Sequence, residues 1–280
     1  MELIVSSGCA YVLGLEDQFK VAAEAGFDGF EYLVNREHVP ETTAKLIELS
    51  RHYEVPIRNV HAPFQPVPGW DGPVTSLLST VNVARAVEAR SVTFHPPERA
   101  VDGVTFNRWI VGIDDFQKTV GGGDVIITVE NMPRSKSWRG IKVPFATAPY
   151  RYQERDELWE LLEEQNLFMT FDTTHFGTAG ENLVAAYAQF RDRVRTIHLS
   201  NFSKKEFQEH LPFDQGDLDL ADFIDRALGM GFSGLLTLEV FPEFLQTHEG
   251  GITGALKEFV RWVEGVTGLT RERRGGQAQG

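Results

Sequence analysis

The sequence predicts a single-domain α/β fold, the (β/α)8 TIM barrel, for three reasons. A length of 280 residues is normal for one such barrel. Strand-like apolar runs alternate with helical patterns through eight repeats. Seven of these runs end on a residue able to bind a metal or move a proton: Glu31, His61, His95, Glu130, Asp172, His198 and Glu239. In a parallel barrel all strand C-termini point to one mouth, where the active sites of such enzymes lie.

The eight units can be placed in order along the chain. The strands are continuous apolar runs, as in a parallel sheet covered by helices, and are expected at Glu2–Ser6, Phe27–Glu31, Ile57–His61, Ser91–His95, Asp124–Glu130, Leu167–Asp172, Arg195–Ser200 and Leu235–Val240. Each precedes a helical pattern, and these are expected at Leu15–Ala25, Glu41–Tyr53, Val74–Ala89, Phe106–Val120, Arg155–Gln165, Glu181–Phe190, Leu220–Leu228 and Gly251–Val266. Residues 1–268 then form the barrel, and the polar, glycine-rich residues 269–280 form a disordered tail.

Composition narrows the class of protein. The formal net charge of -13 argues against unaided binding to nucleic acid or to an anionic membrane. No apolar run approaches the roughly 18 residues of a membrane span, and no signal peptide precedes the first strand. The single cysteine, Cys9, excludes an intramolecular disulfide and an all-thiolate metal site. We therefore expect a cytoplasmic protein without a membrane or nucleic acid partner. The sequence is compatible with a homo-oligomer.

Four of the run ends form the strongest candidate metal site. Glu130, Asp172, His198 and Glu239 end runs five to eight, so a barrel would bring them to one point. Three carboxylates and one imidazole make a mostly oxygen donor set, which suits manganese, magnesium, cobalt or zinc. The alternative for any one of them is an ordinary polar residue at the rim of the barrel.

Five more residues are candidates for a second metal or for substrate binding. They are His61, His95, His175, His210 and Glu31. The first two end neighbouring runs, and His175 follows Asp172 by three residues. Glu31 lies where a substrate hydroxyl could be gripped, although a salt bridge at the rim would explain it equally. Asn131 and Asn201 follow strand ends and could orient metal ligands.

A long segment, residues 132–150, follows the fifth strand and could form a lid, since long loops in compact domains often do. It contains Trp138 and Arg139, and Phe64 lies in another loop on the same side of the barrel. These three residues are the candidate lid residues. The alternative is a solvated surface loop.

Taken together, these motifs resemble those of the xylose-isomerase-like barrel superfamily, which includes sugar isomerases and epimerases and the endonuclease IV type of apurinic-site nuclease. The resemblance covers roughly residues 1–268 and rests on GFDGFEYL, VHAPF, TFHPP, ITVENMP, FDTTHFG, IHLSN, HLPFDQGDL and LTLEVFPE. In the ketose 3-epimerase branch one metal is held by four residues, which the resemblance places at Glu130, Asp172, His198 and Glu239. The two glutamates of that branch also exchange the substrate proton.

The nuclease branch binds three zinc ions. The resemblance places their ligands at His61, His95, Glu130, Asp172, His175, His198, His210 and Glu239. One further aspartate of that set falls at Gln208, which is a poor zinc ligand. The aspartate common after the seventh-strand histidine is replaced by Asn201.

Two enzymatic functions follow, and one without catalysis. The first is a metal-dependent sugar or polyol isomerase or epimerase, in which Glu130 and Glu239 transfer a proton through a metal-stabilised ene-diolate. One divalent ion with three carboxylates has a net charge of about −1, which suits a neutral sugar. The alternative is a metal-dependent phosphodiesterase of the endonuclease IV type, with a second metal at His61 and His95. A catalytically inactive barrel used for binding is the third.

Overall fold

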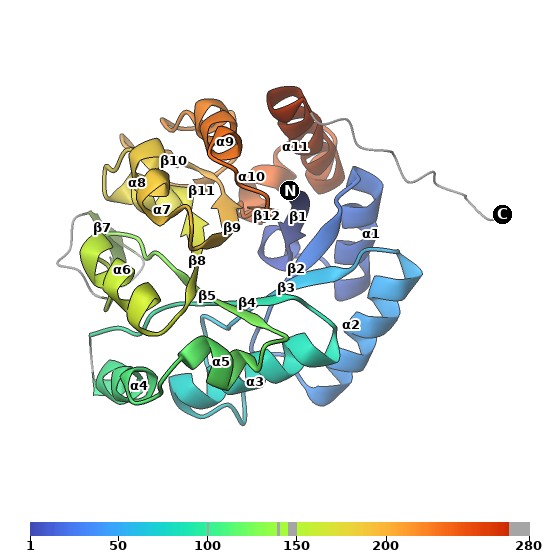
Figure 1. Ribbon diagram of the computed structural model, residues 1–280. Helices are drawn as coiled ribbons and strands as arrows, with labels where there is room; N and C mark the ends of the chain where they lie inside the picture. The colour runs from blue at the N-terminus through green and yellow to red at the C-terminus, as the bar shows by residue number, and fades with distance from the viewer. Residues whose placement is uncertain (100, 139–140, 145–149, 269–280) are drawn as a thin grey trace.

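The protein is a closed barrel of eight parallel strands, seen in a computed structural model that describes residues 1–99, 101–138, 141–144 and 150–268 (Figure 1). The strands pair in the order β1-β12-β9-β8-β5-β4-β3-β2, and β1 closes the ring by pairing with β2. Their bounds are β1 Glu2–Ser6, β2 Gly29–Leu33, β3 Ile57–His61, β4 Ser91–Phe94, β5 Ile126–Glu130, β8 Phe168–Asp172, β9 Val194–Leu199 and β12 Leu235–Leu238. The predicted fold class is confirmed.

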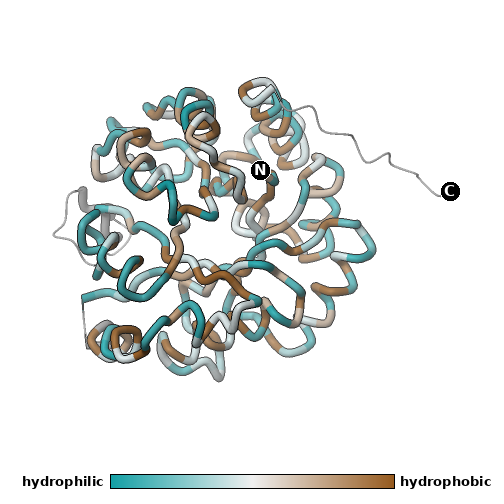
Figure 2. The backbone as a smooth tube through the Cα atoms, in the orientation of Figure 1, coloured by the Kyte–Doolittle hydropathy of each residue, from teal (hydrophilic) through white to brown (hydrophobic). Residues whose placement is uncertain are grey.

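Helices form the outer ring around the barrel. They are α1 Leu15–Ala25, α2 Pro40–His52, α3 Gly72–Ala86, α4 Val101–Val111, α5 Phe116–Gly121, α6 Arg155–Glu164, α8 Leu183–Phe190, α9 Leu220–Gly229 and α11 Gly251–Thr267. Figure 2 shows apolar stretches along the strands and mixed colouring along the helices. That contrast fits strands covered on both faces and helices that bury one side only. None of the described helices is long and apolar enough to cross a bilayer.

The single helix predicted over Phe106–Val120 is wrong, because the segment contains two helices, α4 and α5. Asp115 between them has a left-handed backbone, with φ of 49°, and its side chain accepts a hydrogen bond from the amide of Lys118. A residue with positive φ interrupts an α-helix, and an aspartate there caps the next one. The predicted tail, residues 269–280, lies outside the described residues.

Short elements at the strand C-termini were not predicted. They are the 3₁₀ helix η1 Ser7–Ala10, α7 Thr173–Thr178, α10 Pro242–Gln246, the hairpin β6 Ser135–Trp138 with β7 Ile141–Pro144, and the hairpin β10 Asn201–Ser203 with β11 Gln208–Leu211. All of them follow barrel strands directly or within the next loop, so they surround the mouth. Their lengths are below those at which periodicity distinguishes a helix from a loop.

Hydroxyl groups fill part of the barrel interior. Thr93, Thr128 and Thr170 lie on the neighbouring strands β4, β5 and β8, and none has any exposed surface. Their Oγ1 atoms are 2.7 to 3.1 Å apart, so they satisfy one another's hydrogen bonds. Two of these strands place a carboxylate two residues later, at Glu130 and Asp172. A layer of hydrogen-bonded threonine side chains therefore lies directly beneath the mouth of the barrel.

Candidate metal centre

Acidic and histidine side chains from seven of the barrel strands converge at the mouth. Glu31, His61, Glu130, Asp172 and His198 lie in their strands, whereas His95 and Glu239 come one residue after β4 and β12. Close groups of potential ligand atoms, each within 4.8 Å of one another, are formed by His61, His95 and Glu130, by Glu130, Asp172, His198 and Glu239, and by Asp172, His175 and His210. Glu130 belongs to the first two groups and Asp172 to the last two.

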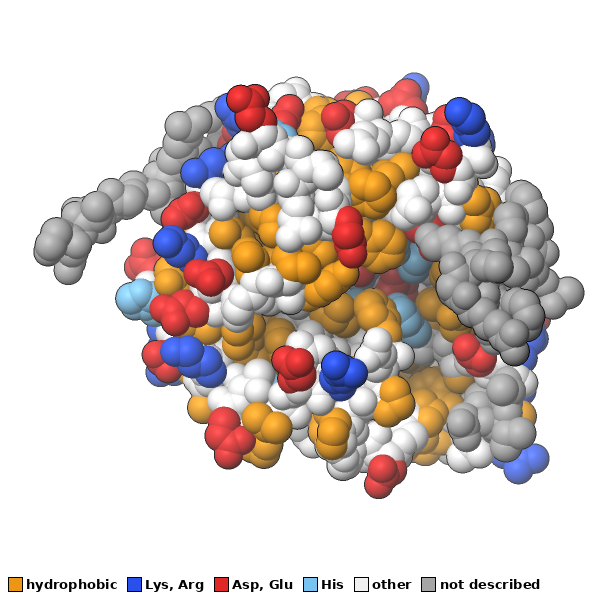
Figure 3. Space-filling model, turned by 180° about the vertical axis from the view of Figure 1, so that it is seen from behind, with side chains coloured by type: hydrophobic (Ala, Val, Ile, Leu, Met, Phe, Trp, Pro, Cys, Tyr) orange, Lys and Arg blue, Asp and Glu red, His pale blue; other side chains and the backbone are white. Residues whose placement is uncertain are grey.

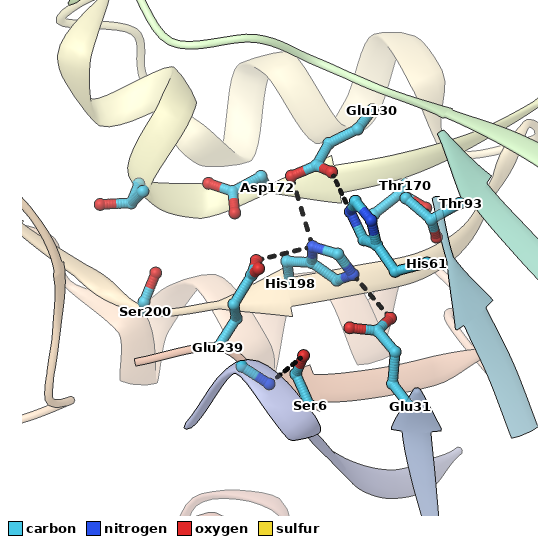
Figure 4. Close-up of polar contacts among 12 residues, drawn as sticks. Ser6, Glu31, His61, Thr93, Glu130, Thr170, Asp172, His198, Ser200 and Glu239 are labelled. Carbon is cyan, nitrogen blue, oxygen red and sulfur yellow. Dashed lines mark hydrogen bonds and ion pairs between the residues drawn. The ribbon is translucent and has the colours of Figure 1, made fainter. Parts of the chain in front are cut away.

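The four-residue group is centred on the His198 ring (Figure 4). His198 Nδ1 lies 2.8 Å from Glu239 Oε2 and 3.3 Å from Glu130 Oε1. The carboxyl of Asp172 faces the same space, and its Oδ1 accepts a hydrogen bond from the amide of His175, at the start of α7. All four side chains are nine-tenths buried or close to it.

The donor atoms of this group fit a divalent ion. Among the described residues, Asp172 Oδ2, His198 Nδ1 and Glu239 Oε2 are buried without a hydrogen-bond partner. His198 Nδ1 and Glu239 Oε2 are close in space, but their mutual orientation makes no hydrogen bond. A buried unpaired polar atom is costly, and a cation held by several oxygens and one nitrogen would satisfy all three atoms.

The pKa shifts of these residues also indicate that positive charge is lacking at the site. Burial raises the pKa of Asp172 well above its usual value, and the carboxylates of Glu130 and Glu239 add to the rise. Burial also opposes ionisation of Glu239, but the His198 ring outweighs it and lowers the pKa of Glu239 to about 2. For His198, burial alone would lower the pKa, yet Glu31, Glu239 and Glu130 raise it well above the usual value. Without a cation, imidazole rings alone, with His198 at the centre, must balance the buried carboxylates.

His61 and His95 contact the other oxygen of Glu130. Each places its Nε2 3.0 Å from Glu130 Oε2. The Nδ1 of His61 donates to the carbonyl of Ala62 at 2.7 Å, since a carbonyl can only accept. Phe64 stacks on His95 with ring centroids 4.8 Å apart. These two histidines and Glu130 are thus arranged like the ligands of a second ion.

His175 and His210 form the third group with Asp172. His175 Nδ1 donates to the carbonyl of Asn131 at 2.8 Å, which leaves its Nε2 free of a proton when the ring is neutral. Burial lowers the pKa of His175 to about 4, so the neutral form prevails at pH 7. His210 has a left-handed backbone, with φ of 53°, a strained state that functional sites often contain. Its amide donates to Thr174 Oγ1, and its carbonyl accepts from the amide of Phe241.

Glu31 pairs with His198 inside the barrel, and its expected role in substrate binding stays a prediction. Its side chain has no exposed surface, and its Oε2 is 3.0 Å from His198 Nε2. It also falls outside the three ligand groups of the described residues. Figure 4 shows Glu31 on the side of the His198 ring away from Glu130 and Glu239.

The two asparagines have different tasks. The side chain of Asn131 brackets the backbone of Asp172, donating to its carbonyl at 3.0 Å and accepting from its amide at 2.7 Å. Asn201 organises the loop after His210 instead: its Oδ1 accepts from the amide of Leu218, and a Cβ on Gly216 would lie only 2.5 Å from that oxygen. Asn201 therefore acts on loop structure, and Asn131 on a candidate ligand.

Phe64 is the candidate lid residue that the structure describes most fully. Its side chain is 56% exposed beside the mouth. Figure 3 shows histidine and acidic side chains at the floor of a hollow bordered by apolar side chains. Trp138 ends strand β6 of a hairpin, but its side chain and the whole of Arg139 lie outside the described residues. Their role as lid residues stays a prediction.

Sequence reasoning missed two residues that support the site. Asn59 lies two residues before His61 on β3, so strand alternation could have placed it on the same inner face. Cys9 lies under Glu239: its thiol donates to the carbonyl of Leu238 and accepts from the amide of Val240, both at 3.2 Å. No signal in the sequence joins Cys9 to residues more than 220 positions away.

Comparison with known proteins identifies the family of this barrel. The model of the xylose isomerase-like TIM barrel family matches residues 19–261, and the chain belongs to that family. An uncharacterized protein of Mycobacterium leprae is 28% identical over 250 residues, which cover 84% of this chain and 87% of that protein.

Solved structures share the fold. A D-tagatose 3-epimerase-like protein superposes with a TM-score of 0.64 and 20% identity over 95% of this chain and 99% of its own. A D-allulose 3-epimerase from Methylomonas sp., solved in complex with D-allulose, gives a TM-score of 0.62 and 14% identity over 94% and 96%. At these identities the likeness concerns the fold.

Proposed function

We propose that this protein is a metal-dependent sugar or polyol isomerase or epimerase. The observation that carries the proposal is the convergence of unpartnered buried donor atoms from Asp172, His198 and Glu239 beside Glu130. Sugar epimerases among the proteins of the same fold support this reaction class. A divalent ion would be held by these four residues.

Glu239 is the better placed of the two glutamates to move a proton. Its side chain is 12% exposed and its Oε2 has no hydrogen-bond partner, whereas Glu130 is 1% exposed and accepts from His61 and His95. Glu239 would remove the proton from the substrate carbon, and Glu130 would serve on the other side of that carbon. When bound, the ion would stabilise the negative charge that develops on two adjacent substrate oxygens.

A neutral polyhydroxylated substrate suits the charge of the mouth. Three carboxylates with one divalent ion leave a net charge of about −1, which disfavours a phosphorylated sugar. Phe64 offers an exposed aromatic face next to His95, where an apolar face of a sugar could pack.

Solvent deuterium exchange tests the reaction class. Manganese-loaded protein incubated in D2O with D-allulose, D-tagatose or D-fructose should place deuterium on the carbon next to the carbonyl, as detected by proton NMR. Protein stripped with a chelator should give no exchange. Turnover of any of these ketoses without deuterium in substrate or product would contradict a proton transfer that exchanges with solvent.

Hydrolysis of a phosphodiester is the second candidate function, favoured by one observation. The three ligand groups are contiguous and share Glu130 and Asp172, as expected for neighbouring metal ions bridged by carboxylates. Two such ions can stabilise both the attacking and the leaving oxygen. Gln208, which the resemblance places at a zinc-binding aspartate of the nuclease branch, donates its side-chain amide to the carbonyl of Glu209.

We expect no efficient incision of an abasic duplex at physiological salt, because a net charge of -13 opposes the phosphate contacts that supply non-specific affinity. The measurement is a gel assay with zinc-loaded protein and a labelled duplex containing one abasic site. Rapid incision that Glu130→Ala abolishes would make the hydrolase the leading function.

A further inference from the structure

A chain of buried hydrogen bonds crosses the barrel interior and ends on His198. Ser91 Oγ on β4 donates to Asn59 Oδ1 on β3 at 2.7 Å. Asn59 Nδ2 then donates to Glu31 Oε2 on β2 at 2.6 Å, and also to Thr93 Oγ1. The same Glu31 oxygen is 3.0 Å from His198 Nε2. Every side chain of this chain is buried.

The last contact spans the barrel rather than two neighbouring strands. β2 and β9 are separated in the sheet by β1 and β12, so Glu31 reaches His198 across the interior. Burial of a carboxylate costs free energy unless hydrogen-bond donors offset the lost hydration. Glu31 is fully buried, and two donors meet one of its oxygens. Such an arrangement is not needed for packing, which apolar side chains would achieve more cheaply.

The contact fixes which nitrogen of His198 carries the proton. A carboxylate oxygen only accepts, so Nε2 must donate to Glu31. A neutral imidazole has one N–H, and Nδ1 is then left with its lone pair. Nδ1 is the atom that lies between Glu239 and Glu130 without a hydrogen bond. The bond to Glu31 therefore directs a lone pair at the candidate metal position.

We propose that Glu31, held by Asn59, is a positioning residue that sets the tautomer and ring orientation of His198 for metal binding. This inference rests on the proposed metal centre. Glu31 acts through His198 and touches neither metal nor substrate. Metal-bound histidines commonly donate their other N–H to such a partner, and removal of the partner typically weakens metal binding about 10–100-fold.

Two substitutions at one position separate charge from geometry. Both donors meet the same oxygen of Glu31, while its Oε1 has no hydrogen-bond partner among the described residues. Glu31→Gln can therefore keep both bonds with its carbonyl oxygen and lose only the charge, whereas Glu31→Ala loses both. Thr80→Val is the matched control, since Thr80 on α3 is equally buried and its hydroxyl donates to the backbone carbonyl of Ser76, away from the mouth.

Metal affinity and the tautomer are then measured separately. Competition titration with a chromophoric chelator should show manganese or zinc affinity lowered about 10–100-fold in Glu31→Ala. Glu31→Gln should lose less, since a neutral acceptor makes roughly half as strong a hydrogen bond. Thr80→Val should bind as the wild type does. In metal-free protein, at a pH high enough to neutralise the His198 ring, 15N NMR of the histidines should show His198 protonated at Nε2 in the wild type and in Glu31→Gln, and a mixture of tautomers in Glu31→Ala.

The results distinguish this inference from the function on which it rests. Wild-type protein that binds no divalent ion would remove the metal centre itself. Wild-type protein that binds an ion, together with Glu31→Ala of unchanged affinity and unchanged His198 tautomer, would overturn the positioning role alone. Should Glu31→Ala not fold, Glu31→Met replaces it, because methionine fills similar space without an acceptor; unchanged metal affinity and an unchanged His198 tautomer in that variant would overturn the role as well.

Discussion

Replacement of Glu239 by glutamine is expected to lower kcat by about 10²–10⁴-fold, the range for a lost general acid or base. The amide keeps an oxygen close to His198 Nδ1, which lies 2.8 Å from the carboxylate in the native protein, but it cannot accept a substrate proton. KM should change little, because the shape of the mouth is kept. Steady-state kinetics on the substrate found by deuterium exchange give both values.

Glu243→Gln is the matched control for this substitution. Glu243 lies four residues further on, in α10 at the same mouth, and bonds to the hydroxyl of Tyr11 rather than to the ligand group. Its variant should keep kcat. Metal content must be measured on both variants, and a Glu239→Gln protein with full metal and wild-type kcat would remove Glu239 from the chemistry.

Replacement of His198 by alanine should remove most of the bound metal. The ring supplies the one nitrogen of the four-residue group and is its most central member, with contacts to Glu239, Glu130 and Glu31. Elemental analysis after gel filtration measures the loss. His248→Ala serves as the control, since His248 bonds to Glu258 away from the ligand groups.

Thermal denaturation gives an independent readout of the same loss. An ion that binds only the folded state raises the free energy of unfolding by RT ln(1 + [L]/Kd), so added metal should raise the Tm of the wild type and of His248→Ala. The Tm of His198→Ala should be insensitive to added metal. Retention of metal by His198→Ala, with an unchanged response of its Tm, would place the ion elsewhere.

Much of the fold could be predicted from the sequence because a parallel barrel produces a repeated pattern of apolar strands and helices. Strands buried on both faces are continuous apolar runs, and the predicted bounds of Glu2–Ser6 and Ile57–His61 match β1 and β3. The division of Phe106–Val120 into two helices could not be predicted, because it depends on the left-handed backbone of one residue, Asp115. A hydrophobic pattern does not indicate the backbone conformation of a single residue. The hairpins near the mouth escaped because short strands carry too few residues for a periodicity.

The candidate site could be predicted as a set of residues but not as a set of contacts. Strand ends converge by topology, so the convergence of Glu130, Asp172, His198 and Glu239 needed only the fold. The position of Glu31 below His198 depends on side-chain length and on the stagger of strands across the interior. The support of Glu239 by Cys9 depends on a turn after β1 that brings distant segments together.

Glu130 divides its two oxygens between separate pairs of histidines. Oε1 faces His198 and His175, at 3.3 and 3.4 Å, and Oε2 faces His61 and His95, both at 3.0 Å. The two oxygens belong to one rigid planar group, so a displacement that improves the contacts of one pair alters those of the other. Free energies of substitution on the two sides of Glu130 should therefore not add, and a double-mutant cycle between His61 and His198 measures a coupling that neither single variant contains.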